Sequence, residues 1–534
     1  MKRISAKRHL TVGLTVLIGL FLTWGVIYSQ DKLKAGIEAY KKGDYDQAIY
    51  LLNQHLSASP YDYDGNYYLG NSYFQKQNWS EALRVYTKAY QKKVKAELLY
   101  QMALTSIQMG DLAQAEKYAL EGVNLKGTKE EIGQMNYLLA KVQFEQKKYH
   151  EADITLRKAL SAEPDNSSYH KLLGDINYER NVASLAISEY NEALKHDPSL
   201  AKELHYKLGR AYFLNRQFNE ALDQFKQAIE SDSNFAEAYL DLGNLYYWGN
   251  KANEALWAYE RYLKLAPGIK EVLSKIGKMY YSSGQFEKSL EYLGKAKSAG
   301  ADGEIDSLLT ESWFKVGVSN YNQFDKTGDS TASAKAESSF VAVTRQSPTY
   351  SEAYSYLGLI QYKRKNYSGA IEHYKRKIEL DPASHNAYTN LAYAYHDLGK
   401  HDSAVSALQK SVELKPDNAV ALGFLAWIYF DNLKNYDRAA LYYEKILQLD
   451  SADCEARGFA GVSYLIQKKY SPAITQLREA IRCKPRDKQY NLWLAQAYEQ
   501  AGQKENARIY YKKVLEIDPN NKVAQERLDI LEFY

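Results

Sequence analysis

The stretch LGNSYFQKQNWSEALRVYTKAY at residues 69–90 recurs downstream as LGRAYFLNRQFNEALDQFKQAI (208–229) and LGNLYYWGNKANEALWAYERYL (242–263). The last two copies begin 34 residues apart, and this spacing organises nearly the whole chain. A chain of 534 residues is longer than one hydrophobic core usually serves, so it forms either several domains or one extended array. The repetition favours the array. We place fourteen copies, here numbered repeats one to fourteen, which begin near residues 29, 63, 96, 133, 167, 202, 236, 270, 303, 351, 385, 420, 454 and 488.

The residues shared by the copies have the chemistry of a pair of antiparallel helices. A small residue such as Gly70, Gly209 or Gly243 follows a leucine, where a larger side chain would push the second helix away. The pattern L-G-x-x-Y, then A-x-x-x-F, then a proline resembles the tetratricopeptide repeat. This resemblance implies an all-α fold, a right-handed superhelical α-solenoid of helix pairs over residues 31–520. Each pair is expected to stack on its neighbours, because one pair cannot bury its apolar face alone.

Three segments depart from the repeat. Repeat nine carries a polar insert, NQFDKTGDSTASAK (322–335), between its two helices. The insert is either a loop that binds a partner or a tolerated surface insertion. Residues 521–534 are expected to form a capping helix that covers the last repeat through Val523, Leu528 and Leu531. The third segment, residues 1–30, precedes the array.

The N-terminal segment predicts a membrane anchor or an export signal. Residues 10–30, LTVGLTVLIGLFLTWGVIYSQ, contain no charged residue and are long enough to cross a bilayer as a helix. An uncleaved anchor is favoured over a cleaved signal peptide, because the apolar core is long and Ile27 stands where a small residue is preferred. Basic residues on both sides of the span discriminate weakly between orientations. We expect an extracytoplasmic, periplasmic solenoid, with a cytosol-facing array as the alternative.

The net charge of +4 is carried by Lys2, Arg3, Lys7 and Arg8, so the array itself is neutral. A neutral body lacks the clustered basic charge that nucleic acid requires, and nucleic acid is therefore not expected as a partner. Phosphate-binding and nucleophile motifs are absent, and the histidines are scattered over different repeats. We predict no catalytic residue, no metal or other cofactor and no small-molecule substrate, so the chain is not expected to be an enzyme.

The inner surface of the array is the candidate binding site. In the tetratricopeptide family, positions 2, 5, 9, 12 and 13 of the first helix line this surface, and here positions 5 and 12 are mostly aromatic. An aromatic groove is suited to gripping peptide side chains, although tyrosine also abounds in such repeats for packing alone. Arg210 and Lys278 beside Asn244 resemble in part a carboxylate clamp, from which Asp241 and Glu271 depart. The predicted groove residues are Tyr67, Asn71, Phe74, Tyr206, Arg210, Phe213, Asn244, Tyr247, Trp248, Lys275, Lys278 and Tyr281.

The two cysteines of the chain both fall in repeat thirteen. Cys454 begins its first helix and Cys483 ends its second, and antiparallel helices bring those ends together. The pair forms a disulfide outside the cytoplasm, or else two unpaired buried thiols.

The sequence therefore predicts a non-catalytic scaffold or receptor, tethered to or exported across a membrane, that binds partner proteins or peptides in its groove. The alternative is an accessory subunit of an envelope enzyme or of a secretion or assembly complex, which positions a catalytic partner. The fold leaves the identity of the partner open.

Overall fold

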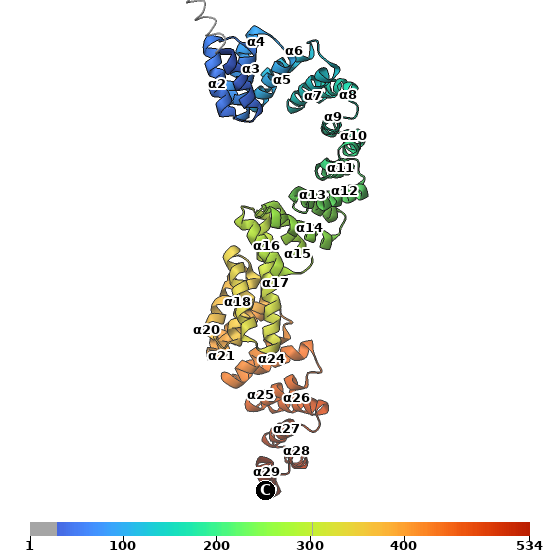
Figure 1. Cartoon of the computed structure of the whole chain (residues 1–534). Coiled ribbons are helices and arrows are strands. Elements are labelled where there is room, and N and C mark those ends of the chain that lie inside the picture. Colours follow the sequence, from blue (N-terminus) through green and yellow to red (C-terminus); the bar gives the residue numbers. More distant parts are fainter. Residues whose placement is uncertain (1–28, 302, 534) are drawn as a thin grey trace, which may run out of the picture. The chain divides into compact units, whose positions relative to one another are not determined.

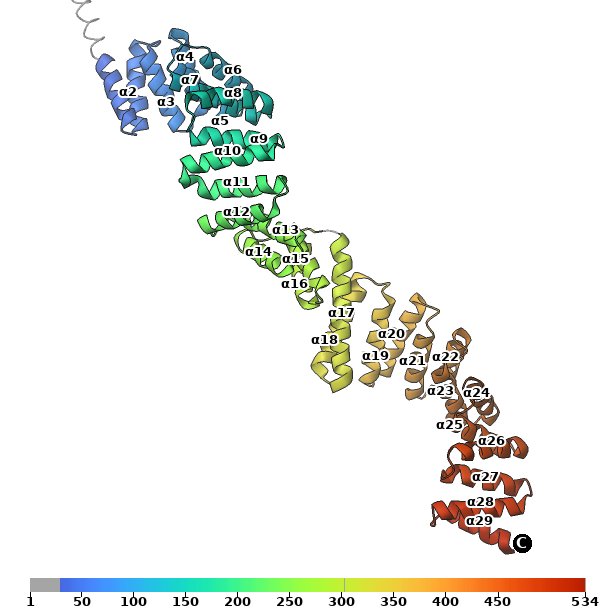
Figure 2. The same ribbon diagram turned by 90° about the vertical axis from the view of Figure 1, so that its right-hand side faces the viewer.

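The computed structural model describes residues 29–301 and 303–533, which form helices joined by short turns, without a β-strand (Figures 1 and 2). The chain divides into two compact units, residues 1–267 and residues 268–534, and each is described by itself. The all-α array of helix pairs predicted from the sequence is confirmed.

The first unit contains repeats one to seven. Figure 2 shows how successive helices, such as α9 to α12, lie side by side. The helices of this unit are residues 29–41, α2 (Tyr45–Ala58), α3 (Tyr63–Gln75), α4 (Trp79–Lys92), α5 (Ala96–Gln108), α6 (Leu112–Val123), α7 (Lys129–Glu145), α8 (Tyr149–Ala162), α9 (Ser167–Glu179), α10 (Ala183–His196), the 3₁₀ turn η1 (Pro198–Leu200), α11 (Ala201–Leu214), α12 (Phe218–Ser231), α13 (Ala236–Trp248) and α14 (Ala252–Leu265).

The second unit contains repeats eight to fourteen and the capping segment. In repeat twelve the first helix ends in a π-helical turn, η2. The helices are α15 (Lys270–Ser282), α16 (Phe286–Ser298), α17 (Gly303–Thr327), α18 (Ser330–Gln346), α19 (Ser351–Lys363), α20 (Tyr367–Leu380), α21 (His385–Asp397), α22 (His401–Leu414), α23 (Ala419–Trp427), η2 (Ile428–Asn432), α24 (Tyr436–Leu449), α25 (Cys454–Ile466), α26 (Tyr470–Cys483), α27 (Lys488–Gln500), α28 (Lys504–Ile517) and α29 (Lys522–Phe533).

In several repeats a ring of the second helix lies on a glycine of the first helix. A Cβ atom built on Gly70 would lie 2.4 Å from the Tyr86 ring of the same repeat. The same arrangement recurs between Gly243 and Tyr259, at 2.7 Å. The first helix therefore needs glycine here because the ring occupies the space of a side chain, and the stacked repeats bury such rings almost completely.

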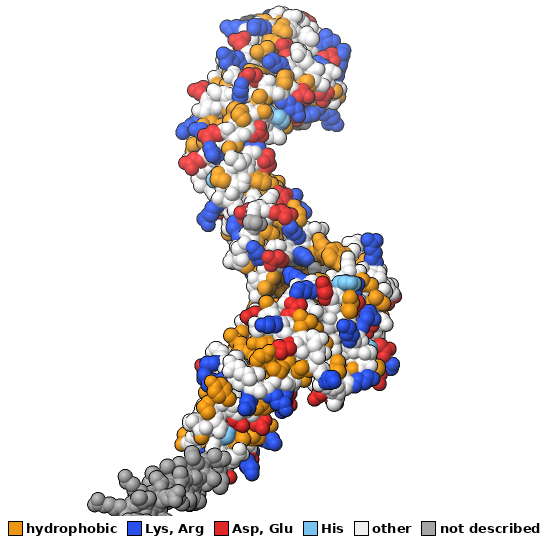
Figure 3. Space-filling model, turned by 90° about the horizontal axis from the view of Figure 1, so that it is seen from above, with side chains coloured by type: hydrophobic (Ala, Val, Ile, Leu, Met, Phe, Trp, Pro, Cys, Tyr) orange, Lys and Arg blue, Asp and Glu red, His pale blue; other side chains and the backbone are white. Residues whose placement is uncertain are grey.

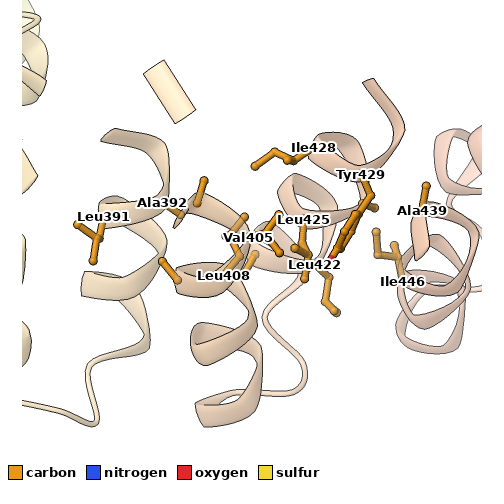
Figure 4. Close-up of a cluster of buried hydrophobic side chains, with 14 of the residues drawn as sticks. Leu391, Ala392, Val405, Leu408, Leu422, Leu425, Ile428, Tyr429, Ala439 and Ile446 are labelled. Carbon is orange, nitrogen blue, oxygen red and sulfur yellow. The ribbon is translucent and has the colours of Figure 1, made fainter. Parts of the chain in front are cut away.

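Apolar clusters bridge successive repeats within each unit. Figure 4 shows part of one cluster in the second unit, where side chains of α21 to α24 meet. Leu408, Leu422 and Leu425 are fully buried there. Such interfaces between neighbours supply the stability that an isolated helix pair lacks.

The polar insert of repeat nine is not a loop. Its residues lengthen both helices, so that α17 runs to Thr327 and α18 begins at Ser330. Gly328 makes the turn with a φ of 70°, and the Asp329 carboxylate accepts a hydrogen bond from the amide of Thr331 at the start of α18. The added residues therefore form a longer hairpin.

Helix α29 covers the end of the array, but with a different face from the predicted one. Leu528 and Leu531 are buried against α27 and α28. Val523 is 45% exposed, and Ala524 takes the buried position instead. Residues 524, 528 and 531 follow the spacing of one helical face, which excludes residue 523.

The predicted membrane span at residues 10–30 lies almost wholly outside the described residues. Among the helices that are described, none is both long enough and apolar enough to cross a bilayer.

Candidate functional site

The predicted groove residues of α3 have packing partners. Tyr67 stacks on Tyr63 with ring centroids 5.9 Å apart, and Phe74 packs against Trp79 at 4.9 Å. Asn71 is only 6% exposed, and its Oδ1 accepts a hydrogen bond of 2.6 Å from the Tyr86 hydroxyl. Asn71 thus supports the interior of its own repeat.

Most of the predicted residues of α11 and α13 lie around one cavity of about 210 Å³ in the first unit, and Tyr206 and Tyr247 are outside its lining. Four of its lining residues were predicted from the sequence: Arg210, Phe213, Asn244 and Trp248. The remaining lining residues are Tyr178, Phe225 and Asp241.

Arg210 is the cation of this cavity. Its guanidinium lies over the Tyr178 ring, 5.0 Å from the centroid. On the other side, the Tyr206 hydroxyl donates a hydrogen bond of 3.0 Å to the Asp241 carboxylate. Burial raises the pKa of Asp241, although the Tyr206 hydrogen bond and Arg210 oppose the shift. The cavity therefore presents a cation and a carboxylate between aromatic walls.

A second cavity of about 150 Å³ continues this surface toward α7 and α9. It shares Tyr178 and Arg210 with the first cavity. Lys207 forms an ion pair of 2.6 Å with Asp175 in its wall. The other lining residues are Phe144, Glu179 and Tyr190. The surface of α7, α9, α11 and α13 that these two cavities mark is called the groove below.

Sequence reasoning missed a larger pocket of about 520 Å³ beside the groove. It shares Phe213 and Trp248 with the first cavity, and these two rings stack with centroids 5.2 Å apart. The pocket lies where the turn after α13 meets the start of α12. Its lining residues are Phe213, Phe218, Asn219, Leu222, Leu245, Tyr246, Trp248, Gly249 and Lys251.

The aromatic residues at position 12, which the sequence assigned to partner binding, have a packing role in several repeats. Phe74, Phe144 and Tyr281 each contact an aromatic residue five positions later, at the start of the second helix. In repeat seven the residue at that place is Ala252, and Tyr247 is 43% exposed. The adjacent Trp248 is 63% exposed. Repeat seven therefore leaves its ring at position 12 exposed.

The three predicted residues of α15 belong to the second unit. Lys278 forms an ion pair of 2.8 Å with Glu304, and the Tyr281 ring packs on Phe286. Lys275 is half-buried. These contacts account for Lys278 and Tyr281 within the second unit.

The cysteines of repeat thirteen are joined in the structure. Cys454 and Cys483 form a disulfide with their Cα atoms 5.9 Å apart.

Other chemistry is sparse in the described part of the chain. No group of three or more His, Cys, Asp or Glu residues there is arranged to hold a metal ion. Acidic and basic side chains are interspersed on the face shown in Figure 3.

Family models agree with this architecture. Models described as TPR repeat match residues 211–248 and 358–399, and models described as tetratricopeptide repeat match residues 137–201, 385–418, 419–453 and 460–522. The chain is a tetratricopeptide repeat protein with many repeats. A further model, for subunit 3 of the anaphase-promoting complex (cyclosome), matches residues 41–122 of these repeats.

The individual relatives match part of this chain or, at low identity, most of its length. Tetratricopeptide repeat protein 37 of Xenopus laevis is 28% identical over 176 residues, which are 32% of this chain and 11% of that protein. The crystal structure of MamA is 25% identical, with a TM-score of 0.29, over 30% of this chain and 94% of MamA. The Cut9–Hcn1 hetero-tetramer of APC/C is 15% identical, with a TM-score of 0.33, over 94% and 96% of the two chains.

Proposed function

We propose that this tetratricopeptide repeat protein is a non-catalytic scaffold that binds partner proteins in the groove of its first unit. The observation that carries the proposal is the continuity of the groove, because the two cavities share Tyr178 and Arg210 over four consecutive first helices. Arginine and aromatic residues are the types that contribute most to protein interfaces. A continuous surface of this kind suits an extended or helical peptide segment.

Photo-crosslinking in living cells tests the groove. A photoreactive amino acid replaces Tyr247 beside the groove and, in the control, Lys226, which is exposed on α12. We expect a discrete protein adduct from position 247 alone, and the same adduct to be lost when Arg210→Glu is added. Adducts from both positions equally, or from neither, would contradict binding in the groove.

The identity of the adduct also distinguishes the two functional hypotheses. A partner enzyme whose activity is lost without the solenoid would favour the accessory subunit. A partner without such an activity would favour the receptor or scaffold.

We propose further that the N-terminal segment tethers or exports the solenoid to an extracytoplasmic compartment. The cysteine pair supports this location, because disulfides persist mainly in oxidising compartments. A maleimide added to denatured cell extract should label neither cysteine unless a reductant is present. Labelling without reductant would indicate free thiols and weigh against export.

A further inference from the structure

In several repeats a polar residue at position 14, just after the first helix, reaches back to the second helix of the preceding repeat. Lys76 forms an ion pair of 2.7 Å with Asp46, and Arg180 forms one of 3.1 Å with Asp153. The Gln146 amide donates a hydrogen bond of 3.1 Å to the carbonyl of Leu112. We call such a contact a seam strut, because it spans the gap between two successive repeats at the turn between their helices.

Struts also occur in the second unit, so they are a property of the repeat. Arg364 lies 2.6 Å from the Glu337 carboxylate, and the Gln467 amide donates a hydrogen bond of 2.8 Å to the carbonyl of Tyr436. In each case a long side chain occupies the space between two turns.

Repeat seven has Gly249 at position 14, so it has no strut. The backbone does not require glycine there, since φ is −76° and ψ is 6°. A Cβ atom would meet only the carbonyl oxygens of Leu245 and Tyr246 in the preceding turn of helix, at 3.3 and 3.6 Å. The missing side chain leaves open the pocket of about 520 Å³ described above, which we call the seam pocket.

The walls of the seam pocket are apolar and incompletely covered. Trp248 is 63% exposed and Phe218 is 49% exposed. Trp248 is also unusual in sequence, because position 13 holds no other aromatic residue in the fourteen copies. Large apolar side chains that line a concave surface and remain in contact with water are typical of a binding pocket.

The charge at the rim is positive. Lys251 is the charged residue of the lining, and its ammonium group lies 6.0 Å from the centroid of the Tyr246 ring. Arg210 stands on the other side of the wall formed by Phe213 and Trp248. Within the described residues, neither cation forms an ion pair with a carboxylate of the chain at 4 Å or less. A carboxylate on a bound molecule would complement them.

We propose that the seam pocket binds a large apolar side chain, aromatic or branched aliphatic, of a partner peptide that carries a carboxylate within two residues of it. The apolar side chain fills the space that a strut occupies in other repeats, and the carboxylate pairs with Lys251. The proposal deepens the proposed function and rests on it. It places the apolar side chain of the partner beside the turns that join the two helices of repeats six and seven.

Selection from a random peptide library tests the chemistry of the partner. Phage that display random dodecapeptides are selected on the full-length chain after depletion on the variant Gly249→Gln. This variant installs the side chain that forms the strut in repeat four. We expect the enriched peptides to share a Phe, Trp, Tyr, Leu or Ile with an Asp or Glu within two positions. Enrichment of basic peptides, or no enrichment over the variant, would overturn the proposal.

Fluorescence anisotropy with one enriched peptide, labelled with fluorescein, then tests the geometry. Gly249→Gln should weaken binding about tenfold or more, because it fills the pocket. The matched control is Ser283→Gln, the same side chain at position 14 of repeat eight, which should change affinity less than about twofold. Equal loss in both variants would overturn the proposal.

A charge exchange tests Lys251. Lys251→Glu should weaken the acidic peptide about fivefold and favour a peptide in which the carboxylate is replaced by an ammonium group. The control Lys226→Glu, on the same unit, should alter neither affinity. If the peptides ignore the charge at residue 251, the proposed pairing is wrong.

The two proposals fail separately. If crosslinking from residue 247 yields an adduct but the selection yields no motif, the groove binds proteins and the seam pocket is not their anchor. If neither experiment gives a product, the proposed function itself fails.

Discussion

Repeat two (residues 63–92) and repeat seven (residues 236–265) have the same interior. In both, a tyrosine ring of the second helix lies on a glycine of the first. The tyrosine hydroxyl donates a hydrogen bond to the asparagine that directly follows this glycine. Their turns differ. Repeat two has the Phe74–Trp79 ring pair and the Lys76 strut, whereas repeat seven has Tyr247 with Ala252 and no side chain at Gly249.

The comparison teaches that positions between the helices are fixed by packing, whereas positions in the turn are free to change. Removal of a ring partner and a strut from one turn exposes aromatic surface without disturbing the helix pair. A binding pocket thus arises from the absence of side chains that other repeats carry.

The largest effect is expected when the shared glycine contact is broken. Gly70→Val and Gly243→Val should each destabilise the fold by about 3 kcal/mol, because the new side chain overlaps a buried tyrosine ring. Hydrogen exchange of the amides of α3 and α13 measures the local change. Gly249→Ala is the control and should shift stability by less than about 0.5 kcal/mol, since its Cβ would meet two carbonyl oxygens at 3.3 and 3.6 Å and no side chain. A similar loss at residue 249 would contradict the distinction between interior and turn.

A smaller effect is expected from the ring pair. Trp79→Ala should cost about 2 kcal/mol, because it removes a half-buried ring that packs on Phe74. The converse change, Ala252→Trp, gives Tyr247 a ring partner and should gain at most about 0.5 kcal/mol. Urea unfolding followed by circular dichroism measures both. If Ala252→Trp destabilises the chain, the turn of repeat seven is less free than proposed.

The hydrogen bonds donated by the two tyrosine hydroxyls should contribute differently to stability in the two repeats. Tyr86→Phe leaves the buried Asn71 without its donor and should cost about 1.5 kcal/mol. Tyr259→Phe should cost about 0.5 kcal/mol, because Asn244 is half-buried and water can replace the hydroxyl. Equal losses would mean that the two asparagines are equally inaccessible to water.

The smallest effect concerns Asp241, whose pKa is raised by burial. A raised pKa means that the folded state binds the proton more tightly than the unfolded chain, so stability falls as pH rises from about 4 through the folded pKa. Asp241→Asn removes this loss and keeps an acceptor for Tyr206. The free energy of unfolding of the variant, relative to that of the native chain, should therefore be higher at pH 7 than at pH 4 by a few tenths of a kcal/mol.

Thermal unfolding at the two pH values measures this gain. The exposed Asp223→Asn on α12 serves as the control and should show no such difference. If the variant is more stable than the native chain at pH 4 but not at pH 7, the direction assigned to the pKa shift of Asp241 is wrong.

The period of 34 residues allowed the helix pairs to be predicted, because each recurring residue has a role in packing. The glycine contacts were predicted in kind, since a small residue that recurs in most first helices requires a close neighbour. The predicted membrane span and the side of the membrane remain predictions.

Contacts between side chains were harder to predict. Asn71 occupies a groove position in the repeat pattern, yet its amide oxygen is used by Tyr86, which only the distance of 2.6 Å reveals. The insert was expected between the helices because it is polar, but its residues continue both helices around one glycine turn. Polarity marks exposure to solvent, which a long exposed hairpin satisfies as well as a loop.

The seam pocket was missed because it depends on a contact that several repeats form at position 14 and that repeat seven does not form. Its signals were present in the sequence, as a tryptophan at position 13 followed by a glycine at position 14. They acquire meaning only when the struts formed by Lys76, Gln146 and Arg180 are known.

The disulfide of repeat thirteen has a mechanical consequence. A helix pair that unfolds under tension lengthens the chain by about 3.5 Å for each residue released. Cys454 and Cys483 are separated by 29 residues, so the covalent bridge withholds roughly 100 Å of extension at this repeat. A pulled array would therefore yield one shortened step among its repeats, and the segment between the cysteines would stay closed as a loop while its neighbours extend.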